Sequence, residues 1–423
     1  MRPRRRPATA AGKSIFDPVH GPIRLDGVAL ALIATPEFQR LWGVRQTGFA
    51  HLVFPGANHT RLEHSLGTFW VAAEMAARLG LSTEEAQQVA VGGLLHDLGH
   101  APFSHTLDPP MLEATGERHE RFSRRRVEGT DAEWPEPKRL VPTVLERFGL
   151  DPRRVADLID PRRPSPRAPL PGSILHGAID ADRIDYLQRD AHYTGVAHGA
   201  IDAVRLFDTL RSSGGRIVFA EKGRSAVEGF VVGRALMYSS VYYHKTVRAA
   251  EMMAQAAVER SPGFPDGATG LFRLTDGELL AQLRATPGIS STLVEGLLER
   301  RLYKRAFGLK VVPRSERARW KGWLADPPAR RTLEDELAQA LGGRPGTVLV
   351  DLAGLADRGD PAEDWSTVGL ELREKITYPF REPGPWKGFA VRPAFGWQAT
   401  VFVAPRLRTP GVEQTIVRTL EHA

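Results

Sequence analysis

The 423-residue sequence predicts a mainly α-helical fold that ends in a smaller C-terminal α+β lobe. Two observations predict this fold class. Apolar residues recur at intervals of three and four through most of residues 26–306, which is the spacing of amphipathic helices. From residue 346 onward the apolar residues form short runs instead, at 347–351 and 397–403, which favours strands before a last helix at 412–420.

The composition limits the class of protein. A chain of this length can bury a sizeable core and can hold two or three domains. The absence of cysteine excludes disulfides, thiolate nucleophiles and zinc–thiolate sites, and it fits a cytoplasmic protein. No apolar run approaches the ~18 residues of a membrane span. The formal net charge of +7 favours anionic partners, either nucleotides or nucleic acids.

The first predicted elements lie before the central helices. Residues 15–27 predict a strand, a turn and a second strand, because proline and glycine interrupt the run. A helix follows at about 26–34. Thr35 and Pro36 then supply the N-cap and first residue of another helix, which is expected to continue towards Gln46.

The central helices are the most regular part of the pattern. A turn at 56–61 leads into a helix that carries His64. Ser82, followed closely by two glutamates, marks the start of the next helix. This second helix is apolar up to Leu95 and is interrupted at Gly99, so a polar segment follows directly on a buried helix.

The regular spacing is lost between residues 129 and 172. Proline and arginine are dense at 160–172, which predicts a flexible loop. Helical spacing resumes at Ile174, in a segment that places Asp182, Tyr186 and Asp190 on one face. Further helices are predicted at about 226–253, 276–283 and 292–306.

Two polar residues, His96 and Asp97, stand together at the end of the central apolar helix. An unpaired charge is costly to bury there, and imidazole with carboxylate suits a divalent transition metal or magnesium. His100 lies one turn further on the same face. A chance pair at a helix end is the ordinary alternative. However, seven of the 13 histidines lie between His51 and His119, and this clustering favours chemistry.

Four motifs carry a family resemblance. They read FPGANHTRLEHSLG from Phe54, GLLHDLGHAPFSH from Gly93, AIDADRIDYLQRD from Ala178 and VYYHK from Val241. A histidine, then a His-Asp pair, then a distant aspartate is the signature of the HD superfamily of metal-dependent phosphohydrolases. The residues of the motifs resemble those of the SAM-and-HD-domain deoxynucleoside triphosphate triphosphohydrolases and their bacterial relatives. The resemblance implies an HD-domain helical core.

The expected reaction follows from the ligand set that the resemblance implies, which is His64, His96, Asp97 and Asp182. Two imidazoles and two carboxylates leave positions on a six-coordinate ion for water and phosphate. Manganese, magnesium, iron, cobalt and nickel all accept these donors. No serine or cysteine has the setting of an activated nucleophile, so we expect water to attack phosphorus directly. In the family this reaction converts a deoxynucleoside triphosphate to deoxynucleoside and tripolyphosphate.

The resemblance also implies roles for other residues. His105, with His119 and Asp108 in support and His100 nearby, resembles the group that handles water and leaving group at the α-phosphate. The implied phosphate contacts are Arg61, Arg183 and Arg234, and the implied contacts to the sugar 3′-hydroxyl are Gln46 and Asp190. Tyr186 and Tyr242 are implied to pack on the deoxyribose. Tyr238 is also a predicted substrate contact, at a position where the vertebrate enzyme has histidine.

A nucleotide activator is a further question that the resemblance raises. In the vertebrate enzyme an acidic and a basic residue bind an activating guanine nucleotide, and Ala34 and Trp42 occupy those positions here. Two basic residues of the same site, Lys13 and Arg40, are kept. We therefore expect either no nucleotide activator or one that is read differently.

The predicted organisation has three parts. They are a disordered basic arm at 1–12, an HD phosphohydrolase domain at 13–262, and a C-terminal lobe at 263–423 with a structural or oligomer-forming role. A homodimer or homotetramer is expected, with a deoxynucleoside triphosphate as substrate and no membrane partner. The arginine-rich arm and loops predict a weak secondary affinity for single-stranded nucleic acid.

Two alternatives stay open at this level. The first is another HD phosphohydrolase, such as a nucleotidase, a cyclic-dinucleotide or alarmone hydrolase, or a nuclease. Product identification separates these, because only attack at the α-phosphate releases intact tripolyphosphate. The second is a non-catalytic nucleic-acid-binding protein, which predicts a degenerate metal site although all four ligands are present.

Overall fold

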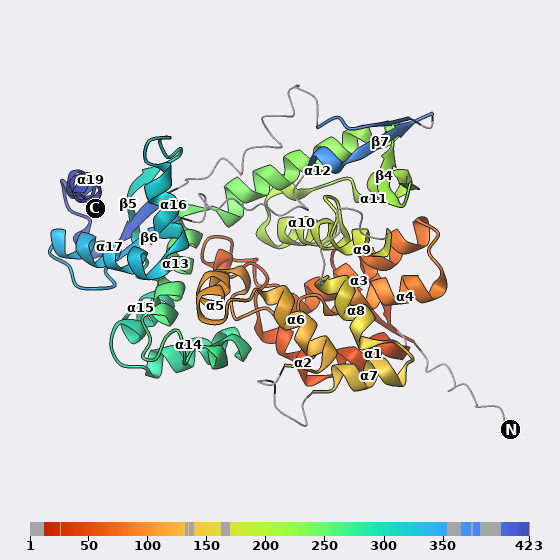
Figure 1. Cartoon of the computed structure of the whole chain (residues 1–423), viewed down its shortest axis with the longest axis horizontal. Coiled ribbons are helices and arrows are strands. Elements are labelled where there is room, and N and C mark those ends of the chain that lie inside the picture. Colours follow the sequence, from red (N-terminus) through yellow and green to blue (C-terminus); the bar gives the residue numbers. More distant parts are fainter. Residues whose placement is uncertain are drawn as a thin grey trace.

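The computed structural model describes residues 12–25, 27–131, 134, 139–161, 170–352, 365–373, 375–380 and 399–422. Over these residues the mainly α-helical fold is confirmed, with three small sheets beside the helices (Figure 1). The predicted basic arm, apart from Gly12, and the predicted loop at 160–172, apart from its ends, lie outside the described residues.

A pair of consecutive helices forms the centre of the molecule. They are α3 (Arg61–Arg78) and α4 (Thr83–Leu95), and α10 (Ala181–Thr194) packs against α3 (Figure 1). Both α3 and α4 begin with a capping box, in which a hydroxyl and a glutamate each satisfy a free backbone amide. The capped start of α3 lies next to His64, whereas His96 and Asp97 follow the other end of α4.

Short helices surround this centre. They are α1 (Gly27–Ile33), α2 (Pro36–Gln39), α5 (Asp108–Thr115), α6 (His119–Glu128), α7 (Val141–Arg147), α8 (Pro152–Ile159), α9 (Leu170–Leu175) and α11 (Ala203–Thr209). The loss of regular structure predicted between 129 and 172 is wrong for α7 and α8. Each is a short helix with proline in its first turn, where a missing N–H costs nothing.

Two predicted helices differ in extent from the observed ones. The helix expected to reach Gln46 ends at Gln39 and continues as a 3₁₀ turn at Arg40–Gly43. The helix expected at 226–253 is divided into α12 (Arg224–Met237) and α13 (Lys245–Glu259) by a π-helical turn at Tyr238–Tyr242. Such π-turns often occur at functional sites because they re-aim side chains.

The second half of the chain adds α14 (Asp276–Ala285), α15 (Ile289–Leu298), α16 (Arg317–Ala325), α17 (Pro327–Ala340) and α19 (Val412–His422). The helix predicted at 292–306 is wrong beyond Leu298, because the chain turns at Arg300 and continues as strand β5 (Lys304–Leu309). The positive φ of Arg300 marks the point where the helix ends.

The strands belong to separate sheets. An antiparallel hairpin joins β1 (Lys13–Asp17) to β2 (Gly21–Leu25), as predicted for residues 15–27. The C-terminal sheet has the order β5–β9–β6, with β6 at Val348–Asp351 and β9 at Ala399–Val403, the two strands expected in the tail.

The remaining sheet connects distant parts of the chain. Its order is β3 (Leu210–Ser213), β4 (Arg216–Ala220), β7 (Gly369–Leu372) and β8 (Lys375–Thr377), and β7 runs parallel to β4. Strands β7 and β8 therefore lie on the β4 side of the molecule, away from the C-terminal sheet (Figure 1). The boundary predicted between 262 and 263 stays a prediction.

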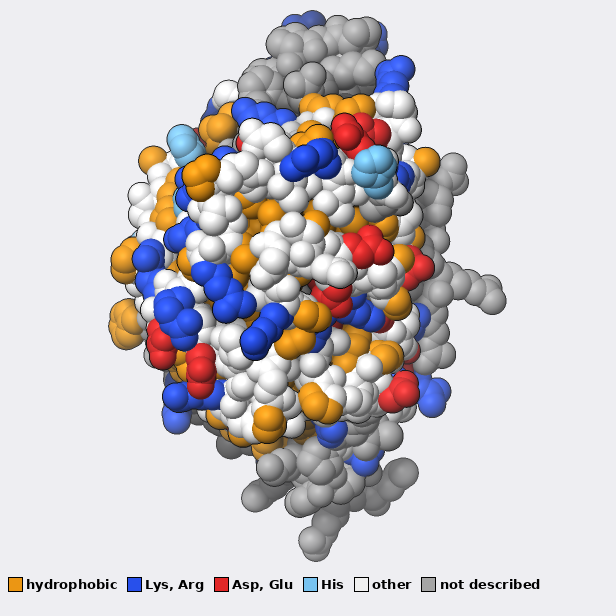
Figure 2. Space-filling model, turned by 90° about the vertical axis from the view of Figure 1, so that its left-hand side faces the viewer, with side chains coloured by type: hydrophobic (Ala, Val, Ile, Leu, Met, Phe, Trp, Pro, Cys, Tyr) orange, Lys and Arg blue, Asp and Glu red, His pale blue; other side chains and the backbone are white. Residues whose placement is uncertain are grey.

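The surface carries charges of both signs. Figure 2, which views the molecule from the side of α19, shows basic, acidic and hydrophobic side chains interspersed on this face. The predicted affinity for single-stranded nucleic acid and the predicted oligomer both stay predictions. Among the helices that the structure describes, none combines the length and the apolar character that a membrane crossing requires.

Candidate metal centre and active site

Four donor side chains approach one another at the end of α4: His64 from α3, His96 and Asp97 from the turn after α4, and Asp182 from α10. His64 Nε2 lies 3.0 Å from Asp182 Oδ1 and 3.5 Å from Asp97 Oδ2. His96 Nε2 lies 3.1 Å from Asp97 Oδ1 and 3.7 Å from Asp182 Oδ1. Neighbouring ligands of one ion stand about 3 Å apart when each bond is about 2.1 Å long. His64, His96 and Asp97 thus have the mutual spacing of a metal site, and Asp182 borders them through the two histidines.

The carboxylates around His64 and His96 raise the pKa values of both imidazoles. Burial opposes protonation of His64, but Asp182 and Asp185 outweigh it and raise its pKa to about 10. The pKa of His96 is raised for a similar reason, since Asp97 and Asp182 outweigh its burial. Metal binding displaces protons from such ligands. A divalent cation would therefore take over the charge balance that protons supply here.

The donor set fits a divalent metal. Two imidazole nitrogens and two carboxylates are borderline donors that suit manganese, iron, cobalt, nickel or magnesium. His96 Nε2 is buried and makes no hydrogen bond among the described residues, although its Nδ1 bonds to the Gly93 carbonyl at 2.7 Å. The Nδ1 hydrogen bond fixes the tautomer of the neutral His96 ring, so the lone pair of Nε2 faces the other three donors.

Glycine allows the turn after α4 to pack closely against its neighbours. A Cβ atom at Gly99 would lie 2.1 Å from the His119 carbonyl oxygen and 2.3 Å from the Ser123 amide. Gly99 N also donates to Ser123 Oγ at 2.8 Å. Any larger residue would push α6 away, so Gly99 sets how close His119 comes to the metal ligands.

His64 is held in place by a buried network that the sequence did not predict. Asp185 accepts from His64 Nδ1 at 2.7 Å and from His20 Nε2 at 2.6 Å, and Arg189 donates to both of its oxygens at 2.9 Å. The carboxylate fits because a Cβ at Gly67 would lie only 1.8 Å from Asp185 Oδ1. This arrangement leaves His64 Nε2 directed at Asp97 and Asp182.

Replacing Asp185 with asparagine is expected to weaken metal binding by about 10–100-fold, because outer partners of ligating histidines typically contribute that much. The affinity is measured by titration against a chelator, with metal content determined by elemental analysis. Asp17→Asn is the matched control, since Asp17 binds the same Arg189 at 2.7 Å without touching His64. Equal affinity in wild type and Asp185→Asn would contradict this prediction.

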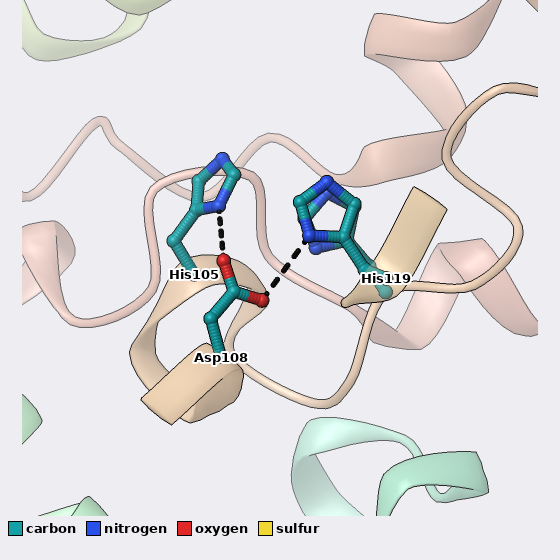
Figure 3. Close-up of side chains that lie close together, drawn as sticks. His105, Asp108 and His119 are labelled. Atoms are coloured by element: carbon teal, nitrogen blue, oxygen red, sulfur yellow. Dashed lines mark hydrogen bonds and ion pairs between the residues drawn. The ribbon is translucent and has the colours of Figure 1, made fainter. Parts of the chain in front are cut away.

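A second cluster lies beside the first, and Figure 3 shows it. The Asp108 carboxylate lies between two imidazoles, at 2.8 Å from His105 Nδ1 and 3.2 Å from His119 Nδ1 (Figure 3). The His105 ring therefore keeps its Nε2 for other chemistry, whereas His119 Nε2 lies 3.5 Å from Glu120 Oε1. The His105 side chain is 60% exposed, whereas that of His119 is 13% exposed, so His105 is the member that is open to solvent.

His100 connects the second cluster to the candidate metal ligands. His100 stacks on His119 with ring centroids 3.7 Å apart, and its Nε2 lies 3.3 Å from Asp97 Oδ1. The four side chains of the second cluster (His100, His105, Asp108 and His119) also stand close enough to hold an ion. Both carboxylate oxygens of Asp108 are already engaged, which favours orientation of the histidines over ligation.

The pKa values of two histidines in the second cluster are shifted in opposite directions. Burial, together with the charges of Arg61 and His119, keeps the pKa of His100 well below its usual range. Burial opposes the charge on His119 too, but Asp108 and Glu120 raise its pKa to about 9. A neutral imidazole and an imidazolium therefore lie face to face, and the charged one bonds to Asp108.

Arg61 and Arg183, two of the predicted phosphate contacts, bind different carboxylates. Arg61 donates to Asp97 Oδ2 at 2.6 Å and to Ser104 Oγ at 2.7 Å, while its Nη2 is buried without a hydrogen bond among the described residues. Arg183 is bound to Asp180 and to the Gly177 carbonyl. Arg61 thus has a donor directed at the metal region, whereas the guanidinium of Arg183 is engaged with Asp180.

The predicted sugar contacts lie together. Asp190 accepts from Tyr242 at 2.5 Å and lies 2.8 Å from His59 Nε2. His59 stacks on Tyr193 with centroids 4.5 Å apart. Gln46 lies near them, because its backbone amide donates to the His59 carbonyl, and its buried Oε1 makes no hydrogen bond among the described residues.

Arg234 joins the aromatic side chains of this region. It donates to the hydroxyls of Tyr186 and Tyr238, both at 3.1 Å, and its guanidinium lies 4.5 Å above the Tyr238 ring. The ring of Tyr242 meets that of Tyr238 edge-on at 4.9 Å. The π-helical turn brings these tyrosines to one wall.

Sequence reasoning missed several supporting residues, and three of them had a signal. His59 belongs to the histidine cluster, and Asp185 and Arg189 stand in the same motif as Asp182. His20 lies outside the four motifs. The predicted remnant of an activator site also needs correction at Arg40. Its guanidinium is buried and donates to the carbonyls of residues 100 and 272–274, so it is not available to a nucleotide.

Comparison with known families identifies two regions. The HD domain family matches residues 61–190, and the family described as HD associated region matches residues 201–369. The first covers all four candidate metal ligands, and the second covers α12, α13 and α14.

Individual relatives agree with this assignment. An uncharacterized protein of Methanocaldococcus jannaschii, MJ1154, is 37% identical over 69% of this chain and 59% of its own length. Human deoxynucleoside triphosphate triphosphohydrolase SAMHD1 is 31% identical over 44% of this chain and 34% of its own length. The chain thus spans less than two thirds of these relatives. A crystal structure of a phosphohydrolase from Bacteroides thetaiotaomicron shares the fold, with a TM-score of 0.69 and 24% identity over 93% of this chain and all of that one.

Proposed function

The chain belongs to the HD-domain proteins that carry an HD-associated region, and we propose that it hydrolyses deoxynucleoside 5′-triphosphates to deoxynucleoside and tripolyphosphate in a metal-dependent reaction. One observation carries the proposal. The carboxylate of Asp97 is shared between the candidate metal ligands and, through His100, the pair of histidines held by Asp108. Metal and acid–base groups would therefore act on one phosphate.

The cation would be held by His64, His96, Asp97 and Asp182. When bound, such an ion neutralises charge on the phosphate and makes water a better nucleophile at neutral pH. Phosphoryl transfer depends mainly on positioning and charge neutralisation, so nearby cationic side chains contribute as well. Arg61 suits this role, because its Nη2 is buried and makes no hydrogen bond among the described residues.

His105 would move the proton. Its Nδ1 is bound to Asp108, which orients the ring, while the exposed side chain keeps Nε2 for proton transfer to the leaving 5′-oxygen. His119, bound to the other carboxylate oxygen, supports Asp108 and not the substrate itself. This division follows from their exposure, since His119 is much more buried than His105.

The sugar would be read by the wall of tyrosines. Asp190 can accept a hydrogen bond from a 3′-hydroxyl, and Gln46 has a buried carbonyl oxygen available nearby. Tyr186 and Tyr242 place apolar ring surface beside it, and an additional 2′-hydroxyl would be buried there without a partner. We therefore expect deoxynucleotides to be preferred over ribonucleotides. The relative in human, whose name states this activity, supports the same proposal.

The test is product identification. Wild-type protein is incubated with dGTP and Mn²⁺, and the products are separated by ion exchange after removal of the metal. The nucleoside is identified by its ultraviolet absorbance and the polyphosphate by ³¹P NMR. Deoxyguanosine and tripolyphosphate in equal amounts are expected, because attack occurs at the α-phosphate. The variant Asp182→Ala, which lacks one ligand, is run in parallel and is expected to give neither product.

Other outcomes would redirect the proposal. Release of orthophosphate or pyrophosphate means that a phosphoanhydride bond is broken instead of the ester bond to the 5′-oxygen, and it indicates a different HD phosphohydrolase. No turnover of any of the four deoxynucleoside triphosphates with Mn²⁺, Mg²⁺, Fe²⁺, Co²⁺ or Ni²⁺ overturns it. Comparison of dGTP with GTP tests the tyrosine wall separately.

A further inference from the structure

The turn that leads to His105 has an unusual backbone. Phe103 and Ser104 both have a φ of 56°, and neither is glycine. This left-handed conformation is unfavourable for residues with a side chain, and it persists only where the surroundings hold it. His105 follows immediately, so whatever holds the turn also sets the position of this imidazole.

A buried carboxylate from a distant part of the chain holds the turn. Asp276 Oδ1 accepts from the Phe103 amide at 2.7 Å, and Oδ2 accepts from the Arg45 amide at 3.0 Å. Asp276 is 4% exposed and belongs to the HD-associated region, whereas the turn belongs to the HD domain. One side chain therefore ties two segments of the active-site wall to α14.

The carboxylate of Asp276 is not needed for its own helix. The start of α14 is capped by Thr275 and Glu278, which bond to each other's backbone amides. The approach of this helix to the wall is close, because a Cβ at Gly43 would lie 2.4 Å from Thr275 Cγ2. Asp276 is thus directed outward from a completed helix start into the HD domain.

The contact continues to the metal ligands. Ser104 Oγ donates to the Arg45 carbonyl at 2.6 Å and accepts from Arg61 Nε at 2.7 Å. Arg61 in turn binds Asp97. The same region is fastened a second time, because Arg40 Nη2 donates to the carbonyls of His100, Phe272 and Leu274 at 2.8, 3.0 and 2.9 Å.

We propose that Asp276 is a positioning residue through which the HD-associated region fixes the Phe103–Ser104 turn and thereby aims His105. Its effect on rate rests on the proposed phosphohydrolase function, whereas its effect on the turn does not. The HD-associated region would then be part of the active-site frame, and Asp276 would act without touching substrate or metal.

The variant Asp276→Asn keeps the shape but replaces one acceptor oxygen by an NH₂ group. That group must face either the Phe103 or the Arg45 amide, so one of the two bonds is lost. We expect kcat to fall by about 100-fold, the effect of a displaced catalytic group, with KM and metal content within twofold of wild type. Glu278→Gln, a change at the exposed cap of the same helix, is expected to leave kcat within twofold.

Two measurements do not depend on activity. In wild-type protein the Phe103 amide should exchange with deuterium at least about a hundredfold more slowly than in a free peptide, and the protection should fall at least tenfold in Asp276→Asn. The imidazole ¹⁵N signals of His105 should shift in the variant, whereas those of His64 should not.

These readouts separate the two proposals. If no deoxynucleotide is hydrolysed but the protection and the His105 shift behave as stated, the proposed function fails and the role of Asp276 in the turn stands. If the Phe103 amide exchanges freely in wild type, the inference is overturned whether or not the variant folds. A folded Asp276→Asn with unchanged protection, or with unchanged kcat in an active enzyme, overturns it too.

Discussion

Replacing Asp97 with asparagine is expected to remove the bound metal and to lower deoxynucleotide hydrolysis at least about a thousandfold, since metal ions supply several kcal/mol of charge stabilisation and each tenfold in rate is about 1.4 kcal/mol. Asp97 faces His64, His96 and His100, and it also neutralises Arg61. Metal content by elemental analysis and initial rates with dGTP and Mn²⁺ measure the two effects.

The same change has a cost in stability. Arg61 and Asp97 form a buried ion pair at 2.6 Å, and removing one partner of such a pair costs about 3–5 kcal/mol. Asp182→Asn is the companion variant, because this side chain is 36% exposed and its loss should disturb the fold less. Both variants should lose metal and rate. If folded Asp182→Asn keeps full metal content and a rate within tenfold of wild type, the assigned ligand set is wrong.

The sequence predicted the helices that carry chemistry better than those that surround them. The segment around His64 and the apolar run up to Leu95 are long and regular, so their periodicity is clear, and they became α3 and α4. Helices α7 and α8 are only seven and eight residues long, and they lie between proline-rich stretches that suggested a loop. Their apolar positions pack on a tertiary surface that local sequence does not reveal.

Predicted ligands and predicted substrate contacts behaved differently. His64, His96 and Asp97 lie together, and Asp182 lies beside both histidines, while their role as metal ligands stays a prediction. For the arginines the motifs gave the position in the sequence but not the partner that each guanidinium binds. Arg61 is directed at Asp97 and Arg183 at Asp180, because each long side chain binds the nearest buried carboxylate. Such choices depend on the folded surroundings and cannot be obtained from spacing.

The supporting residues were the least predictable. Asp276 is 173 positions from the amide that it binds, and nothing in its own segment resembles an active-site motif. His20 stands in a turn after a short strand, yet it reaches Asp185 at 2.6 Å. Contacts of this kind arise when separate elements pack together, so periodicity and motif spacing carry no trace of them.

Replacing His105 with alanine is expected to lower kcat by about 10²–10⁴-fold, the usual contribution of a general acid or base. The metal ligands are not touched, so metal content should stay at the wild-type value, in contrast with Asp97→Asn. His105 is the exposed member of its cluster, and its loss should leave the melting temperature nearly unchanged. A folded, metal-loaded His105→Ala enzyme with a rate within threefold of wild type would assign proton transfer to another group.

The pH dependence of the same cluster gives an independent check. His119 has its pKa raised to about 9, against an ordinary value of 6.5, because Asp108 and Glu120 outweigh its burial. The stabilisation from its charge is therefore fully present below pH 6.5 and is lost as the pH rises through about 9. Wild type should lose more thermal stability than His119→Gln between pH 6 and 10, since the glutamine has no charge to lose. The pair His119–Asp108 then keeps Asp108 fixed for His105 at neutral pH, and activity should fall where this fixation is lost.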